Sequence, residues 1–193
     1  MRLVCAAVLG AALGATCAAA GEAPVFTTFK TLCIDTGAVP EAVRKAVEAA
    51  GGKPELPLAA PTPGEAASLA VWDVDLDGAS YRVQFGDTQS PSDSSRGVES
   101  QTCNIDSATD DEAGIAEARR WVGVPPSHSF SDVMFIEVYD FQQNGPLREP
   151  LPADQRAFHS LELAGQVWAL GLNRSPQGTS MMLAHSVPLR PTR

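Results

Sequence analysis

Residues 72–83, WDVDLDGASYRV, hold three aspartates at alternate positions followed by a glycine. This spacing resembles the start of an EF-hand calcium loop, whose first, third, fifth and sixth positions match Asp73, Asp75, Asp77 and Gly78. The twelfth position of such a loop supplies a bidentate carboxylate, but here it is Gln84, which offers only a neutral amide oxygen. The calcium interpretation therefore lacks the ligand that completes the coordination shell.

A β-hairpin explains the same residues better. If Asp77 and Gly78 form a two-residue turn, Leu76 faces Ala79 and the register of both strands is fixed. That register pairs apolar residues on one face, Val74 with Tyr81, Trp72 with Val83 and Ala70 with Phe85. On the other face it pairs Asp73 with Arg82 and Asp75 with Ser80. A one-residue slip would destroy this agreement, so we predict a hairpin with Asp77 and Gly78 at its turn.

The chain has three histidines, His128, His159 and His185, and none shows the i, i+4 spacing of a helical metal pair. His159 and His185 alternate with apolar residues, which suits half-buried strand histidines with hydrogen bonds. The alternative is a polar site in which the fold brings both histidines to Glu137 or Glu162. Such a site would suit a hydrolytic or metal-assisted enzyme, and we retain it as the second functional hypothesis.

Motifs for nucleophilic, nucleotide and cofactor chemistry are missing from the sequence. It contains no Gly-x-Ser-x-Gly elbow, no glycine-rich phosphate loop and no Cys-x-x-Cys pair. We therefore assign no catalytic residue, metal ligand or cofactor. The sequence favours a binding domain over an enzyme.

Residues 1–20 have the three parts of a secretory signal: basic Arg2, an apolar run and small residues at its end. The apolar run is shorter than the ~20 residues that span a bilayer as a helix, and no later stretch is long enough either. Cys17 raises the competing hypothesis of a lipid anchor. The alanine triplet 18–20 is the plainer cleavage site, so we favour a mature chain that is periplasmic or secreted.

Removal of the signal leaves two of the four cysteines, Cys33 and Cys103. An even pair in an oxidising compartment predicts a disulfide, which would close a loop of about 70 residues. The alternative is two separate buried thiols.

The composition fits one domain, residues 21–193, with a sizeable core: the chain has 193 residues, of which 44% are hydrophobic and 19% charged. Its formal charge is −9, and it becomes −10 without the signal, which holds Arg2 and no acid. Such acidity disfavours nucleic acid and anionic membrane surfaces as partners. A protein or small-molecule partner remains.

Periodicity predicts the order helix, helix, three strands, helix, four strands. The helices are expected within 25–37, 40–51 and 109–122, and the strands within 69–86, 98–105, 132–141 and 157–189. This order predicts an α+β fold, an antiparallel sheet with about three helices packed mainly on one face. Strand 132–141, apolar on both alternations except at Glu137, is expected to be covered on both faces. Loops 86–97 and 142–156 are expected to border the sheet and are the places to look for a site.

The stretches FKTLCIDTG and PEAVRKAVEAAG resemble the start of uncharacterised exported proteins of Gram-negative bacteria. The resemblance covers about the first thirty mature residues, implies an exported small α+β protein, and carries over no functional residue. Our sequence-based hypothesis is a periplasmic or secreted protein that acts by binding.

Overall fold

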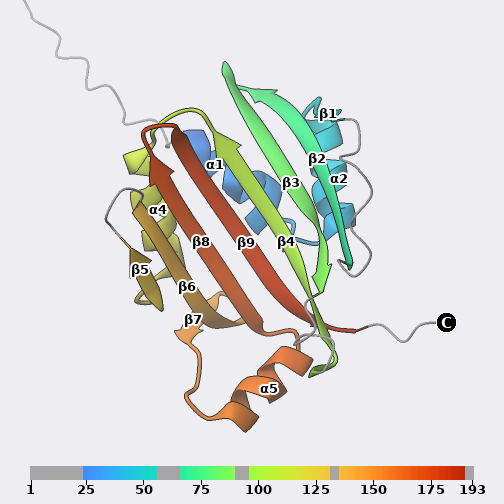
Figure 1. Cartoon of the computed structure of the whole chain (residues 1–193), viewed down its shortest axis with the longest axis vertical. Coiled ribbons are helices and arrows are strands. Elements are labelled where there is room, and N and C mark those ends of the chain that lie inside the picture. The colour runs from blue at the N-terminus through green and yellow to red at the C-terminus, as the bar shows by residue number, and fades with distance from the viewer. Residues whose placement is uncertain (1–23, 56–65, 90–95, 131–134, 190–193) are drawn as a thin grey trace, which may run out of the picture.

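The computed structural model describes residues 24–55, 66–89, 96–130 and 135–189. The expected signal segment 1–20 with Cys17, and residues 90–95 of the expected loop 86–97, lie outside the described residues. The described chain is an α+β domain built on a nine-stranded antiparallel sheet (Figure 1). Strands make up more of the chain than the sequence predicted.

The sheet order is β1-β2-β3-β4-β9-β8-β6-β5, and β7 also pairs with β6. The long strands are β2 (Ala66–Leu76), β3 (Ala79–Gln89), β4 (Val98–Ser107), β6 (Phe135–Asn144), β8 (Val167–Ser175) and β9 (Gly178–Pro188). The short strands are β1 (Lys53–Pro54), β5 (His128–Phe130) and β7 (Leu147–Pro150). Each neighbouring pair is antiparallel.

The β2–β3 hairpin has the predicted register. Leu76 faces Ala79, Trp72 faces Val83, and Asp73 faces Arg82. Its turn requires positive φ at both central residues, which are +52° at Asp77 and +83° at Gly78. Because Asp-Gly accepts these angles readily, the turn sets the pairing of both strands.

Helices pack on one face of the sheet (Figure 1). They are α1 (Pro24–Phe29), which continues into one π-helical turn, η1 (Lys30–Ile34), then α2 (Pro40–Ala49) and α4 (Glu112–Val122). Their buried side chains meet those of the facing strand residues in one core, whose largest members include Phe29, Leu32, Ile105, Ile115, Phe141 and Leu172.

The predicted helix within 109–122 is confirmed as α4, and Asp111 is its N-cap. One Asp111 carboxylate oxygen accepts from Gly114 N at 2.8 Å, and the other accepts from Val25 N of α1 at 3.3 Å. Asp111 N in turn donates to Thr179 Oγ1 of β9 at 2.8 Å. One buried aspartate therefore joins the starts of two helices to the sheet.

Two expectations are wrong. The first strand expected within 157–189 is instead helix α5 (Gln155–Leu163), because Asp154 caps its start and accepts from Ala157 N at 2.8 Å. Strand β6 was expected to be covered on both faces. Its burial alternates instead, with Tyr139 and Phe141 buried towards the helices and Val138 only partly buried on the other side.

The element order repeats across the sheet. The first half contributes α1–η1, β1, β2, β3 and β4, and the second contributes α4, β5, β6, β8 and β9. In the sheet these halves run inward from opposite edges and meet at β4 and β9. Helices α1 and α4 also contact each other. The arrangement is that of a pseudo-two-fold, with α2 added to the first half and β7 with α5 added to the second.

Candidate functional site

Glu137 lies on β6 and faces the helices, with 9% of its surface exposed. It accepts hydrogen bonds from Arg119 of α4, at 2.8 Å from Nε and 3.0 Å from Nη2, and from the Tyr139 hydroxyl. Burial raises the pKa of Tyr139 to about 12, and its hydrogen bond to Glu137 acts in the same direction. The hydrogen bond to Glu137 also raises the pKa of Arg119. Glu137 thus ties β6 to α4.

His185 lies on β9 and also faces the helices. Its ring stacks on the Trp168 indole with centroids 3.8 Å apart and planes 6° apart. Nε2 carries the proton, because its partner at 2.8 Å is the carbonyl of Gly165, which only accepts. Burial lowers the pKa of His185, although the hydrogen bond to Gly165 opposes this shift. The predicted half-buried, hydrogen-bonded histidine describes this residue well.

The structure does not bring Glu137, His159 and His185 together. His185 faces Trp168, which faces Phe141. Since Glu137 precedes Phe141 by four residues, it lies about 13 Å from the His185 row along the strand direction. His159 belongs to α5, where its side chain lies beside that of Glu162. The hydrolytic or metal-assisted hypothesis that required all three therefore has no geometric basis.

The hairpin aspartates point to the face of the sheet opposite the helices. Asp75 accepts a hydrogen bond from Ser80, and Arg82, which faces Asp73, forms an ion pair with Glu55. Within the described residues, no group of three His, Cys, Asp or Glu side chains is arranged to hold a metal ion.

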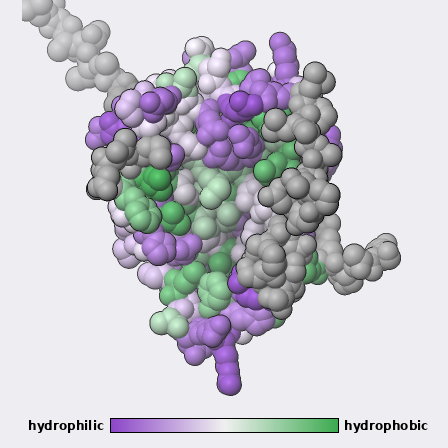
Figure 2. All heavy atoms as spheres, viewed as in Figure 1, coloured by the Kyte–Doolittle hydropathy of each residue, from purple (hydrophilic) through white to green (hydrophobic). Residues whose placement is uncertain are grey.

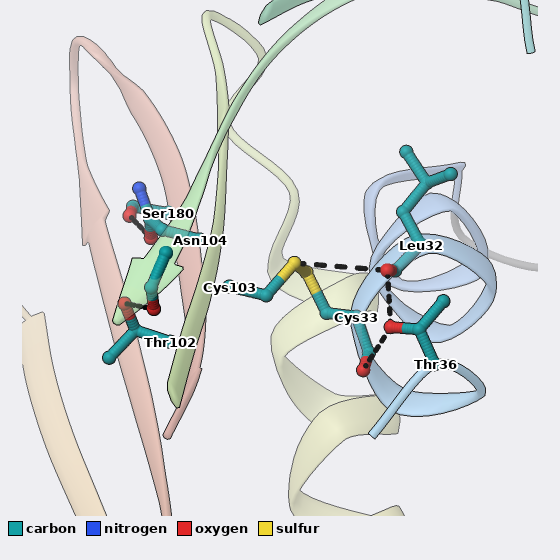
Figure 3. The surroundings of a disulfide bond; sticks show 8 residues. Leu32, Cys33, Thr36, Thr102, Cys103, Asn104 and Ser180 are labelled. Atoms are coloured by element: carbon teal, nitrogen blue, oxygen red, sulfur yellow. Dashed lines mark hydrogen bonds between the residues drawn. A yellow bond between two sulfur atoms is a disulfide. The ribbon is translucent and has the colours of Figure 1, made fainter. Parts of the chain in front are cut away.

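Cys33 of η1 and Cys103 of β4 form the predicted disulfide, with Cα atoms 5.4 Å apart and both side chains fully buried. Figure 3 shows Cys103 pointing from the sheet to η1, while its neighbours Thr102 and Asn104 point to the opposite side. The disulfide thus fixes which face of the sheet meets the helices.

The opposite face, which we call the open face, is formed by the other side chain of each strand alternation. Its register is continuous across the six long strands. One row runs Val71, Gln84, Asn104, Met182, Gly171 and Val138, and the next runs Leu69, Gly86, Thr102, Ala184, Ala169 and Asp140. Within the described residues, no helix covers these rows (Figure 1).

The middle of the open face is flat, because glycine and alanine occupy most of the inner positions of the Ala184 row. Leu69 is 49% exposed and Met182 is 39% exposed. Polar groups are interspersed: Ser180 Oγ donates to Asn104 Oδ1 at 3.0 Å, and Asn173 Oδ1 is buried and has no hydrogen-bond partner among the described residues. Figure 2 shows this side as pale and green in the centre, with a hydrophilic group towards the top.

A pocket lies at the end of the sheet beside α5. It is lined by Arg96, Gln155, Arg156, Phe158, His159 and Glu162, and its volume is about 380 Å³. Loops 86–97 and 142–156 are the two regions in which the sequence analysis expected a site. The pocket brings their ends together, since Arg96 belongs to the first and Gln155 to the second. The i, i+3 spacing of His159 and Glu162 would have signalled their contact had the segment been predicted as a helix.

Comparison of the chain with protein-family models, curated proteins and solved structures finds no match. Within the described ranges, no helix combines the length and hydropathy needed to cross a membrane.

Proposed function

We propose that the protein is an exported binding protein and that its open face docks a protein partner with a basic surface. The exported location rests on the signal-like residues 1–20 and on the Cys33–Cys103 disulfide, which persists in oxidising compartments. The flat middle of the open face carries the proposal. A sheet face of this extent that exposes Leu69 and Met182 favours protein contact over the enclosure of a small ligand.

Charge selects the kind of partner. At the end of the open face nearest the β2–β3 turn, the row Asp73, Arg82 and Asp106 continues into Ser180. Asp75 stands beside it, and Arg82 is engaged by Glu55. This end therefore offers carboxylates beside an apolar and amide surface, which suits a partner with Lys or Arg around an apolar patch.

The test is site-specific photo-crosslinking in cells that naturally make the protein. A photoreactive benzoylphenylalanine at Met182, in the middle of the open face, should give a discrete crosslinked protein. The same probe at Ala49, exposed on α2, serves as the control for random encounters. We expect Ala184→Arg to abolish the crosslink at residue 182, because it places a long cation in the row of small residues.

Ala49→Arg provides the matched substitution, with the same charge change on the helix-covered side. Circular dichroism melting of both arginine variants checks that the fold is retained. Equal crosslinking from residues 182 and 49, or a crosslink that survives Ala184→Arg in a folded protein, would refute the proposal.

A further inference from the structure

The α5 pocket brings together a hollow, a buried carboxylate and two guanidinium groups. Its volume of about 380 Å³ falls within the range of small-molecule sites. Helix α5 lies across one end of the sheet (Figure 1), so the pocket is built on a helix anchored to β8 and β9.

Glu162 is the fixed element of the pocket. Only 1% of its surface is exposed, so its carboxylate needs charged or donor partners. Arg96 Nε lies 3.3 Å from Oε2, and His159 Nδ1 lies 3.5 Å from the same oxygen. Glu162 thus holds Arg96 from the β3–β4 connection and His159 from its own helix at the pocket wall.

Arg156 is the cation left for a ligand. Its side chain has no hydrogen-bond or ion-pair partner within the described part of the chain, and the residue is exposed. Among the described lining side chains, two guanidinium groups stand beside one carboxylate, in a chain of net charge −9. A guanidinium recognises a carboxylate through two parallel hydrogen bonds.

Phe158 gives the pocket an apolar wall beside these charges. An inorganic anion would make no use of the Phe158 ring and would leave most of the pocket empty. An organic acid could pack its apolar part against the ring and fill the remaining volume. We infer that the pocket binds a small organic carboxylate, with its carboxylate on Arg156 and its apolar part against Phe158. This site is separate from the partner surface and does not depend on it.

The test uses benzoate as the probe, titrated into the folded protein by calorimetry and by NMR of the histidine ring protons. Since the chain has only three histidines, His159→Gln assigns the His159 signals by their loss. We expect benzoate to shift the His159 signals and leave those of exposed His128 in place. Arg156→Gln should weaken binding about tenfold or more, because a charge-assisted pair is lost.

Arg120→Gln is the matched control, since Arg120 is an exposed arginine on α4 away from the pocket. Benzamide, which has the ring without the charge, should bind at least about tenfold more weakly than benzoate. Equal benzoate affinity in Arg156→Gln and Arg120→Gln would overturn the inference. So would equal affinity for benzamide, tighter binding of inorganic phosphate, or absence of any benzoate binding.

Discussion

Breaking the disulfide should expose how much of the stability depends on the link between η1 and β4. Cys33 and Cys103 are separated by 70 residues, so the cross-link restricts a long loop in the unfolded chain. In the chain-entropy model a loop of this length stabilises by about 4 kcal/mol at 25 °C. Each buried sulfur removed by an alanine substitution adds about 1 kcal/mol of lost burial. We therefore expect the free energy of unfolding to fall by about 4 to 6 kcal/mol in each of three variants, Cys33→Ala, Cys103→Ala and the double variant.

Urea unfolding followed by tryptophan fluorescence measures these losses, with reductant present to prevent dimers of the single variants. The cross-link account requires strong non-additivity, since either single substitution already removes the whole bond. It also requires a larger denaturant slope for all three variants, because the unfolded chain expands. Single-variant losses that sum to the double-variant loss would show that packing of the sulfurs, and not the cross-link, stabilises the protein.

Three further outcomes follow from the buried polar groups. Because burial lowers the pKa of His185 below 6.5, the unfolded chain binds a proton more readily than the folded chain. The free energy of unfolding should therefore fall as pH drops from about 7 to 5, and the fall should be smaller in His185→Gln. Phenolate absorbance should show Tyr139 ionising only near pH 12, and Glu137→Gln should lower that value. Asp111→Ala should lower the free energy of unfolding, measured with urea, by about 2 kcal/mol or more. The reason is that the Asp111 carboxylate accepts hydrogen bonds from backbone N–H groups at the starts of both α1 and α4.

Local signals predicted the hairpin and the capped helix. In β2–β3 the turn residues dictate which side chains face each other, so register follows from a dozen adjacent residues. In α4 the acidic residues at the start and the apolar residues of one face are both local signals, and Asp111 is the N-cap. The pairing of β4 with β9 joins residues about 80 apart and has no comparable local signal.

Helix α5 was missed because its residues satisfy two periods at once. His159, Leu161 and Leu163 alternate as in a strand, while Phe158, Leu161 and Glu162 share a helical face. In the structure Leu163 is exposed and Glu162 is buried, which is the reverse of what hydropathy would choose. A buried carboxylate is paired by groups distant in sequence, here Arg96, and such pairs are invisible to a pattern read along the chain.

The pseudo-two-fold accounts for the position of the pocket. In the first half, β2 and β3 are joined by a two-residue turn and β3 and β4 by a longer connection; in the second half, β6 and β8 have the long connection and β8 and β9 the tight turn. A two-fold axis between β4 and β9 makes the β2–β3 turn equivalent to the β6–β8 connection and exchanges the two ends of the sheet. The β6–β8 connection therefore lies at the end opposite the β2–β3 turn, which is also the end of the β3–β4 connection. Both long connections consequently lie at one end of the sheet, where Arg96 of the first meets Glu162 of the second. The two halves thus contribute equivalent strands to one sheet but different long connections, and the pocket forms between these connections. Binding residues are commonly found on such connections, which a rigid scaffold holds in position.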